Sequence, residues 1–182
     1  MPPRSIFDDV SFLFLLQLLY KICFKNSIKT DLSEYEFILL SFGEIDCRQD
    51  EGILKHCLKN NSSIKAISQS TARDYIDWVA SELLDHKNKA IILGTPAPPR
   101  IQNHQDINLH EINFLRLSVI QSFNRALSAK CSEAGIKFAD VLKLTSDNHG
   151  FNNGHWMIDN IHLKPKAIKE IFSHYLIQPR TE

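Results

Sequence analysis

Three short apolar runs alternate with longer amphipathic segments along the chain. The apolar runs cover residues 37–42, 90–94 and 136–139, and continuous runs of this length are typical of strands buried on both faces. The amphipathic segments between them are clearest over residues 72–85 and 111–134. In the first of these, apolar side chains recur at helical spacing and form one stripe, made of Tyr75, Ile76, Val79, Leu83 and Leu84. The pattern predicts strands that alternate with helices.

Local signals mark the ends of the predicted helices. Thr71 can cap the first of them, and Gly135 can end the second. A last helix is predicted over residues 164–177 and opens with Pro165. Proline suits the first turn of a helix, because a backbone N–H at that position makes no hydrogen bond within the helix. Strands that alternate with helices of this length build parallel βαβ units. We therefore predict a three-layer α/β/α sandwich with a mainly parallel sheet, forming a single domain over residues 1–182.

The N-terminal segment, residues 1–34, does not follow this alternation. Residues 10–24 are rich in Leu and Phe, but they are too few for a membrane span, which needs roughly 18 apolar residues. The basic start and small-residue cleavage site of a secretory signal are also missing. We interpret the stretch as a buried helix, or a helix plus a strand. The alternative is that it lies on a membrane or on a partner surface.

Charge and cysteine content narrow the class of protein. Lys and Arg total 21, as do Asp and Glu, so the formal net charge is zero and no nucleic-acid partner is expected. The cysteines show no CxxC spacing, which favours reduced thiols in the cytoplasm over disulfides or a structural zinc site; they are Cys23, Cys47, Cys57 and Cys131. For Cys47, a small packed side chain is favoured over a reactive thiol.

A proline-rich loop follows the second predicted strand. Pro96, Pro98 and Pro99 fix the backbone and remove donors, so the loop is rigid where it leaves the carboxyl end of the sheet. Open α/β sheets bind their ligands at this end. The loop therefore either walls a binding site or serves as a stiff crossover without ligand contacts.

The segment that directly follows the first predicted strand carries candidate chemistry. Residues 42–48 read Phe-Gly-Glu-Ile-Asp-Cys-Arg, so their charged side chains lie at the carboxyl end of that strand. Glu44, Asp46 and Arg48 can form an ion-pair network that shapes the loop. The simpler alternative is that Asp46 caps the next helix and pairs with Arg48.

A second segment places Asp159 three residues before His162. A carboxylate at this spacing can reach Nδ1 of the imidazole and leave Nε2 free to act as a general base. The simpler alternative is that Asp159 caps the following turn and His162 is exposed by chance. A zinc site that adds His149 and His155 is a third alternative, but the spacing matches no helix-based ligand pattern, so no metal and no cofactor is expected.

Taken in order, these segments resemble the SGNH (GDSL-like) hydrolase family, in particular the branch with a Gly-Glu-Ile-Asp-Cys-Arg segment. The resemblance covers about residues 35–177 and also includes the Pro-Pro loop, a helix rich in Asn and Arg, a Phe-Ala-Asp strand end and Asp-x-x-His-Leu. It implies a flavodoxin-like sandwich and a serine-type esterase. By resemblance, His162 is the general base, Asp159 orients it, and Gly43 contributes to the oxyanion hole.

The chain departs from the family pattern at two places. Ile45 stands where the family has an oxyanion-hole Asn, and losing one such donor costs about 2.7–4 kcal/mol, so Arg48 or a backbone amide has to replace it. The Gly-Asp-Ser block of the nucleophile is not found. None of the serines before Gly43 follows Gly-Asp, and the nucleophile stays unassigned; these serines are Ser5, Ser11, Ser27, Ser33 and Ser41.

Two functions stay open. The first is an SGNH-like ester hydrolase for a small-molecule or glycan ester, whose nucleophile comes from a segment absent from this chain or from a rearranged N-terminus. The second is a truncated, inactive SGNH-like domain that binds a glycan, a partner chain or a second copy, because a gap in its sheet would recruit a partner. A hydroxyl within about 3 Å of His162 Nε2 would distinguish the first from the second.

Overall fold

The computed structural model describes residues 32–101, 109–159 and 162–179. The chain divides into two compact units, Met1–Glu36 and Phe37–Glu182. In the first unit the description covers only a short turn, Leu32–Glu34, and the residues next to it. The apolar stretch over residues 10–24 lies outside the described residues. All other elements belong to the second unit.

The described sheet has four strands in the order β1-β2-β3-β4. β1 (Ile38–Ser41), β2 (Ala90–Leu93) and β3 (Lys137–Ala139) are parallel, and β4 (Leu176–Ile177) runs antiparallel to β3. Each parallel strand lies within one residue of its predicted range at either end. The mixed α/β class with a mainly parallel sheet is thus confirmed.

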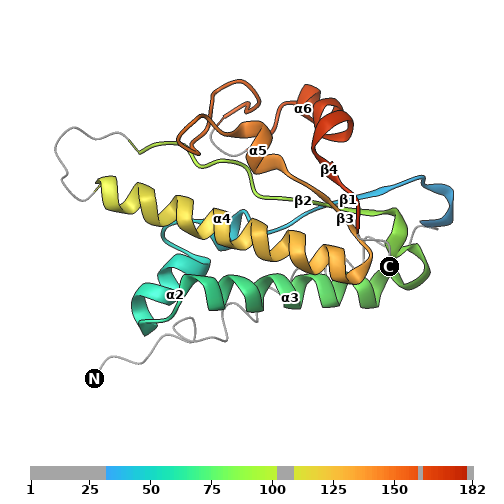
Figure 1. Ribbon diagram of the computed structural model, residues 1–182, viewed down its shortest axis with the longest axis horizontal. Helices are drawn as coiled ribbons and strands as arrows, with labels where there is room; N and C mark the ends of the chain where they lie inside the picture. The colour runs from blue at the N-terminus through green and yellow to red at the C-terminus, as the bar shows by residue number, and fades with distance from the viewer. Residues whose placement is uncertain (1–31, 102–108, 160–161, 180–182) are drawn as a thin grey trace, which may run out of the picture. The chain divides into compact units, whose positions relative to one another are not determined.

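The helices are α2 (Gly52–Asn60), α3 (Ile64–Leu83), α4 (Leu109–Ala134), α5 (Val141–Thr145) and α6 (Pro165–Glu170). The long helices α3 and α4 pack side by side below the strands in Figure 1, whereas α5 and α6 lie above them. Gly135 follows α4 and Pro165 begins α6, as predicted.

The sheet contributes one side of an apolar core. Ile91, Leu93 and Ala139 point to the same face, because side chains alternate along a strand, and they pack against α5 and α6. Their buried partners from the helices are Val141, Leu144, Ala167 and Ile171. On the opposite face, Phe138 and the α4 side chain of Asn124 both approach Gly94. The sheet is therefore held by packing from both directions at its carboxyl end.

Two predicted helix boundaries were wrong. α3 begins at Ile64, where the Ser63 side chain accepts a hydrogen bond from the Ala66 N–H, and Thr71 is buried inside the helix. The first two turns bury Ser68 and Thr71, which are too small and too polar to show as an apolar stripe.

The last predicted helix was wrong only at its end, over Leu176 and Ile177. α6 ends at Glu170 and continues as a π-helix over Ile171–Tyr175, whereas Leu176 and Ile177 form β4. The Asp140 N–H donates to the Tyr175 carbonyl at 2.9 Å, so the edge of β3 captures the chain. Long-range pairing of this kind overrides a local helical pattern.

Candidate functional site

The loop after β1 turns sharply at Gly43. This residue has a φ of 86°, and a Cβ built on it would lie 2.0 Å from Cε1 of Phe123. Phe123 comes from α4 and is fully buried. Close packing of the loop on this ring therefore requires glycine, and it fixes where the loop leaves the sheet.

The charged side chains of this loop form an ion-pair network around Arg48. Its Nε and Nη2 donate to the two carboxylate oxygens of Glu44 at 3.0 and 2.8 Å, and Nη1 lies 3.8 Å from Glu51. The hydrogen bond with Glu44 raises the pKa of Arg48. The predicted network of Glu44, Asp46 and Arg48 forms only between Glu44 and Arg48, and Glu51 takes the place expected for Asp46. The simpler alternative that paired Arg48 with Asp46 was also wrong.

Asp46 lies beneath the loop and caps no helix. It is buried inside the turn Ile45–Cys47, where the Tyr75 hydroxyl donates to its Oδ2 at 2.6 Å. Loss of hydration on burial raises the pKa of Asp46, although the hydrogen bond from Tyr75 opposes the shift. The side chain joins the loop to α3.

We expect the raised pKa of Asp46 to make stability fall with increasing pH. The folded protein keeps this proton to a higher pH than the unfolded chain, so the wild type loses stability as pH rises from the ordinary value of 3.8 through the raised pKa. Asp46→Asn has no proton to lose there. Urea denaturation at about pH 3 and about pH 7 should show the wild type losing stability relative to the variant. A pH-independent difference between the two proteins would contradict this role of burial.

Cys47 is a packed residue. It is buried, and desolvation raises the pKa of its thiol well above the ordinary value of 9.0. A thiol that stays protonated is a poor nucleophile. The burial of Cys47 agrees with its interpretation as a small packed side chain.

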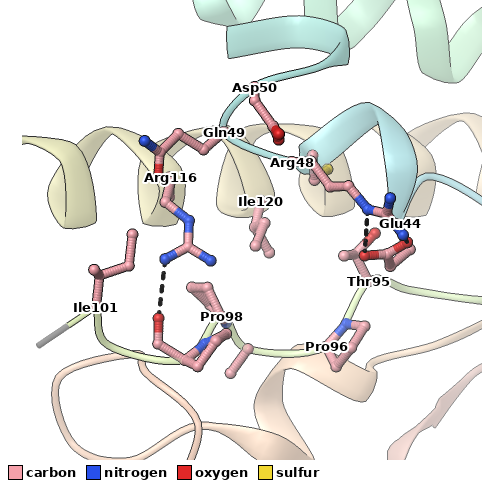
Figure 2. Close-up of a pocket in the computed structure, with 13 residues that line it drawn as sticks. Glu44, Arg48, Gln49, Asp50, Thr95, Pro96, Pro98, Ile101, Arg116 and Ile120 are labelled. Atoms are coloured by element: carbon pink, nitrogen blue, oxygen red, sulfur yellow. Dashed lines mark hydrogen bonds and ion pairs between the residues drawn. The ribbon is translucent and has the colours of Figure 1, made fainter. Parts of the chain in front are cut away.

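A pocket of about 290 Å³ lies at the carboxyl ends of β1 and β2. The loop after β1, the proline-rich loop after β2 and the first part of α4 enclose it (Figure 2). Its lining residues are Glu44, Cys47, Arg48, Gln49, Asp50, Thr95, Pro96, Ala97, Pro98, Pro99, Ile101, Arg116 and Ile120. The proline-rich loop thus walls a pocket, as the first alternative requires, and ligand binding in this pocket stays a prediction.

Three polar side chains of α4 hold the proline-rich loop in place. Asn124 bonds both the N–H and the carbonyl of Thr95 at 2.8 Å. Asn113 does the same for Ile101 at 3.0 and 3.1 Å, and Nη1 of Arg116 donates to the Pro99 carbonyl at 3.1 Å. The spacing of three and eight residues places all three on one face of the helix.

The far side of the loop is tied to the last residue of α5 and to the segment after it. The Thr145 hydroxyl accepts from the Ala97 N–H at 2.8 Å, and the Asn152 N–H donates to the Pro98 carbonyl at 2.9 Å. Arg100 pairs with Asp147 at 3.1 Å at the surface. The pocket wall is therefore preformed and fixed from both sides.

The predicted pair of Asp159 and His162 forms at the tip of a turn between α5 and α6. Oδ2 of Asp159 lies 2.7 Å from Nδ1 of His162, and Oδ1 accepts the His162 N–H at 2.7 Å. The carboxylate thus orients the ring and caps the turn at once. The His162 side chain is 70% exposed, and its Nε2 bonds to no described residue.

The structure does not bring all predicted site residues together. Glu44 and Arg48 line the pocket, whereas Asp46 is buried below it, and neither Asp159 nor His162 is among its lining residues. Across the described parts of the chain, no three His, Cys, Asp or Glu residues are grouped closely enough to hold a metal ion. His149 and His155 therefore do not complete a zinc site with the described dyad.

Sequence reasoning missed the contribution of α4. The sequence did hold a signal: Asn124 is a polar residue within an apolar stripe, and such a residue, here only 5% exposed, needs hydrogen-bond partners when it is buried.

None of the described helices is long and apolar enough to cross a membrane. The chain matches no protein-family model, no curated protein and no solved structure.

Proposed function

We propose that the chain is an SGNH-type ester hydrolase domain, with the three-layer sandwich that this family implies, and that His162 is its general base. The observation that carries the proposal is the Asp159–His162 hydrogen bond of 2.7 Å to Nδ1, which leaves Nε2 exposed. The ordered series of family-like segments supports it. The nucleophile belongs to a segment outside the described residues.

In the proposed mechanism, Nε2 removes the proton of a serine hydroxyl as its oxygen attacks the ester carbonyl. Asp159 keeps Nδ1 protonated and stabilises the imidazolium. The imidazolium then returns the proton to the departing alcohol oxygen. Water, activated in the same way by Nε2, releases the acid from the acyl-serine.

The oxyanion donor in this mechanism is a backbone amide rather than Arg48. Ile45 has no side-chain donor, and the Arg48 guanidinium is already bound to Glu44 and faces Glu51. The rigid turn at Gly43 holds the loop backbone in one conformation, which suits a preorganised amide donor.

The second candidate function is an inactive binding module for a glycan or a partner chain. The separation of the pocket lining from the dyad favours it, because neither Asp159 nor His162 lines the pocket. A binding module would keep the fold and the pocket but would turn over no ester.

Hydrolysis of p-nitrophenyl acetate tests the proposal. We expect His162→Ala to lower kcat/KM by roughly 10²–10⁴-fold, because that is what general-base catalysis contributes. His155→Ala removes another exposed histidine of the same segment and should leave the rate unchanged. A fluorophosphonate probe should label one serine in the wild type and fail to label it in His162→Ala. Equal rates in the wild type and His162→Ala would exclude the mechanism, and an unlabelled, inactive wild type would favour the binding module.

A further inference from the structure

Arg116 places a positive charge inside the pocket. Figure 2 shows its guanidinium pointing from α4 into the space between the two loops. One nitrogen, Nη1, donates to the Pro99 carbonyl at 3.1 Å. Among the described residues, no carboxylate lies within 4.0 Å of this side chain, whereas Arg48 on the opposite wall is paired with Glu44. Within the described residues, Arg116 is thus the pocket cation without a paired carboxylate.

The environment of Arg116 favours an anionic ligand. Desolvation lowers the pKa of Arg116, and the more distant Asp50 only partly offsets this effect. A guanidinium has five N–H donors, and one carbonyl occupies a single one of them. A partly buried cation with unsatisfied donors gains most from a carboxylate, which can accept two parallel hydrogen bonds.

The rest of the pocket selects the size and polarity of the ligand. Ile101, Ile120 and Pro98 give it apolar walls. The buried Thr95 hydroxyl lines it without a hydrogen bond to a described nitrogen or oxygen, and its polar neighbour is the Cys47 thiol. Its volume of about 290 Å³ fits only a small molecule. The carboxylate of Asp50, which also lines the pocket, disfavours a ligand with more than one negative charge.

We propose that this pocket binds a small aliphatic monocarboxylic acid. Its carboxylate pairs with Arg116, and its short hydrocarbon body packs against Ile101, Ile120 and Pro98. Asp159 and His162 do not line the pocket, and pairing of the carboxylate with Arg116 requires no catalytic step, so this binding does not depend on the proposed esterase activity. It serves either an active or an inactive domain.

Calorimetric titration with butyrate tests the proposal on the full chain. The wild type should bind butyrate at millimolar concentration or below, and the neutral isostere butyramide should bind roughly 10- to 100-fold more weakly, because a charged hydrogen-bonded pair is lost. Arg116→Gln should weaken butyrate binding by a similar factor. Arg125→Gln removes an exposed arginine of the same helix and should leave the affinity unchanged.

Several outcomes would overturn the proposal. They are no butyrate binding by the wild type, equal affinity for butyrate and butyramide, or unchanged affinity in Arg116→Gln. Tighter binding of inorganic phosphate would overturn the assignment to a monocarboxylic acid. Arg116→Lys keeps the charge and should retain more affinity than Arg116→Gln. The butyrate and butyramide comparison uses only the wild type, so it decides the question even if the variants fail to fold.

Discussion

Gly43→Ala is expected to lower the free energy of unfolding by about 2–5 kcal/mol. Overpacking a core costs about 1–3 kcal/mol, and a positive φ at a residue with a side chain costs about 1–2 kcal/mol more. Both effects act at this position, because φ is 86° and the new Cβ would lie 2.0 Å from Phe123. Phe123 is fully buried and has no open space to enter. The loop has to move away from α4, or the core has to repack.

Urea denaturation followed by fluorescence of the two tryptophans measures this loss. Gly154→Ala is the matched control, since Gly154 has a φ of 75° but no heavy atom within 4 Å of an added Cβ. It should therefore show only the backbone cost, about 1–2 kcal/mol. If both variants lost the same stability, the contact between Gly43 and Phe123 would not limit the packing of the loop.

The parts of the fold that the sequence predicted well depend on local signals. β2 is buried along its whole length, so a continuous apolar run located it within one residue. The Asp159–His162 hydrogen bond was also predictable, because a three-residue spacing across one turn limits where the carboxylate can lie. Neither inference required knowledge of distant contacts.

The parts that were predicted wrongly depend on distant contacts or on small side chains. β4 forms because β3 offers an open edge to Leu176 and Ile177, which no local pattern records. The start of α3 was hidden because Ser68 and Thr71 occupy buried positions where an apolar stripe was expected.

In the candidate site, too, the parts set by local sequence were predictable and the parts set by distant contacts were not. The loop after β1 and the proline-rich loop could be located at the carboxyl end of the sheet from the order of elements alone. Arg116 also lines the pocket, and the direction in which its side chain points depends on how α4 is rotated against the sheet. That rotation is set by buried contacts such as Phe123 on Gly43, which join residues far apart in the chain.

Asn124→Ala is expected to lower the free energy of unfolding by about 2–6 kcal/mol, because it leaves the Thr95 N–H and carbonyl buried without partners, at about 1–3 kcal/mol for each group. Asn113→Ala removes the same two kinds of bond from Ile101. That site is only half-buried, so water can replace the side chain, and the loss should be about 1 kcal/mol.

Urea denaturation of these two variants distinguishes two explanations of why the proline-rich loop is rigid: its prolines alone, or its hydrogen bonds to α4. If the prolines alone fixed the loop, both variants would lose little stability and to the same extent. A larger loss in Asn124→Ala than in Asn113→Ala would show that α4 holds the loop where it leaves β2. The pocket wall is then a property of the helix as much as of the loop, since Arg116 lies between the two asparagines on the same face and bonds the Pro99 carbonyl between their attachment points.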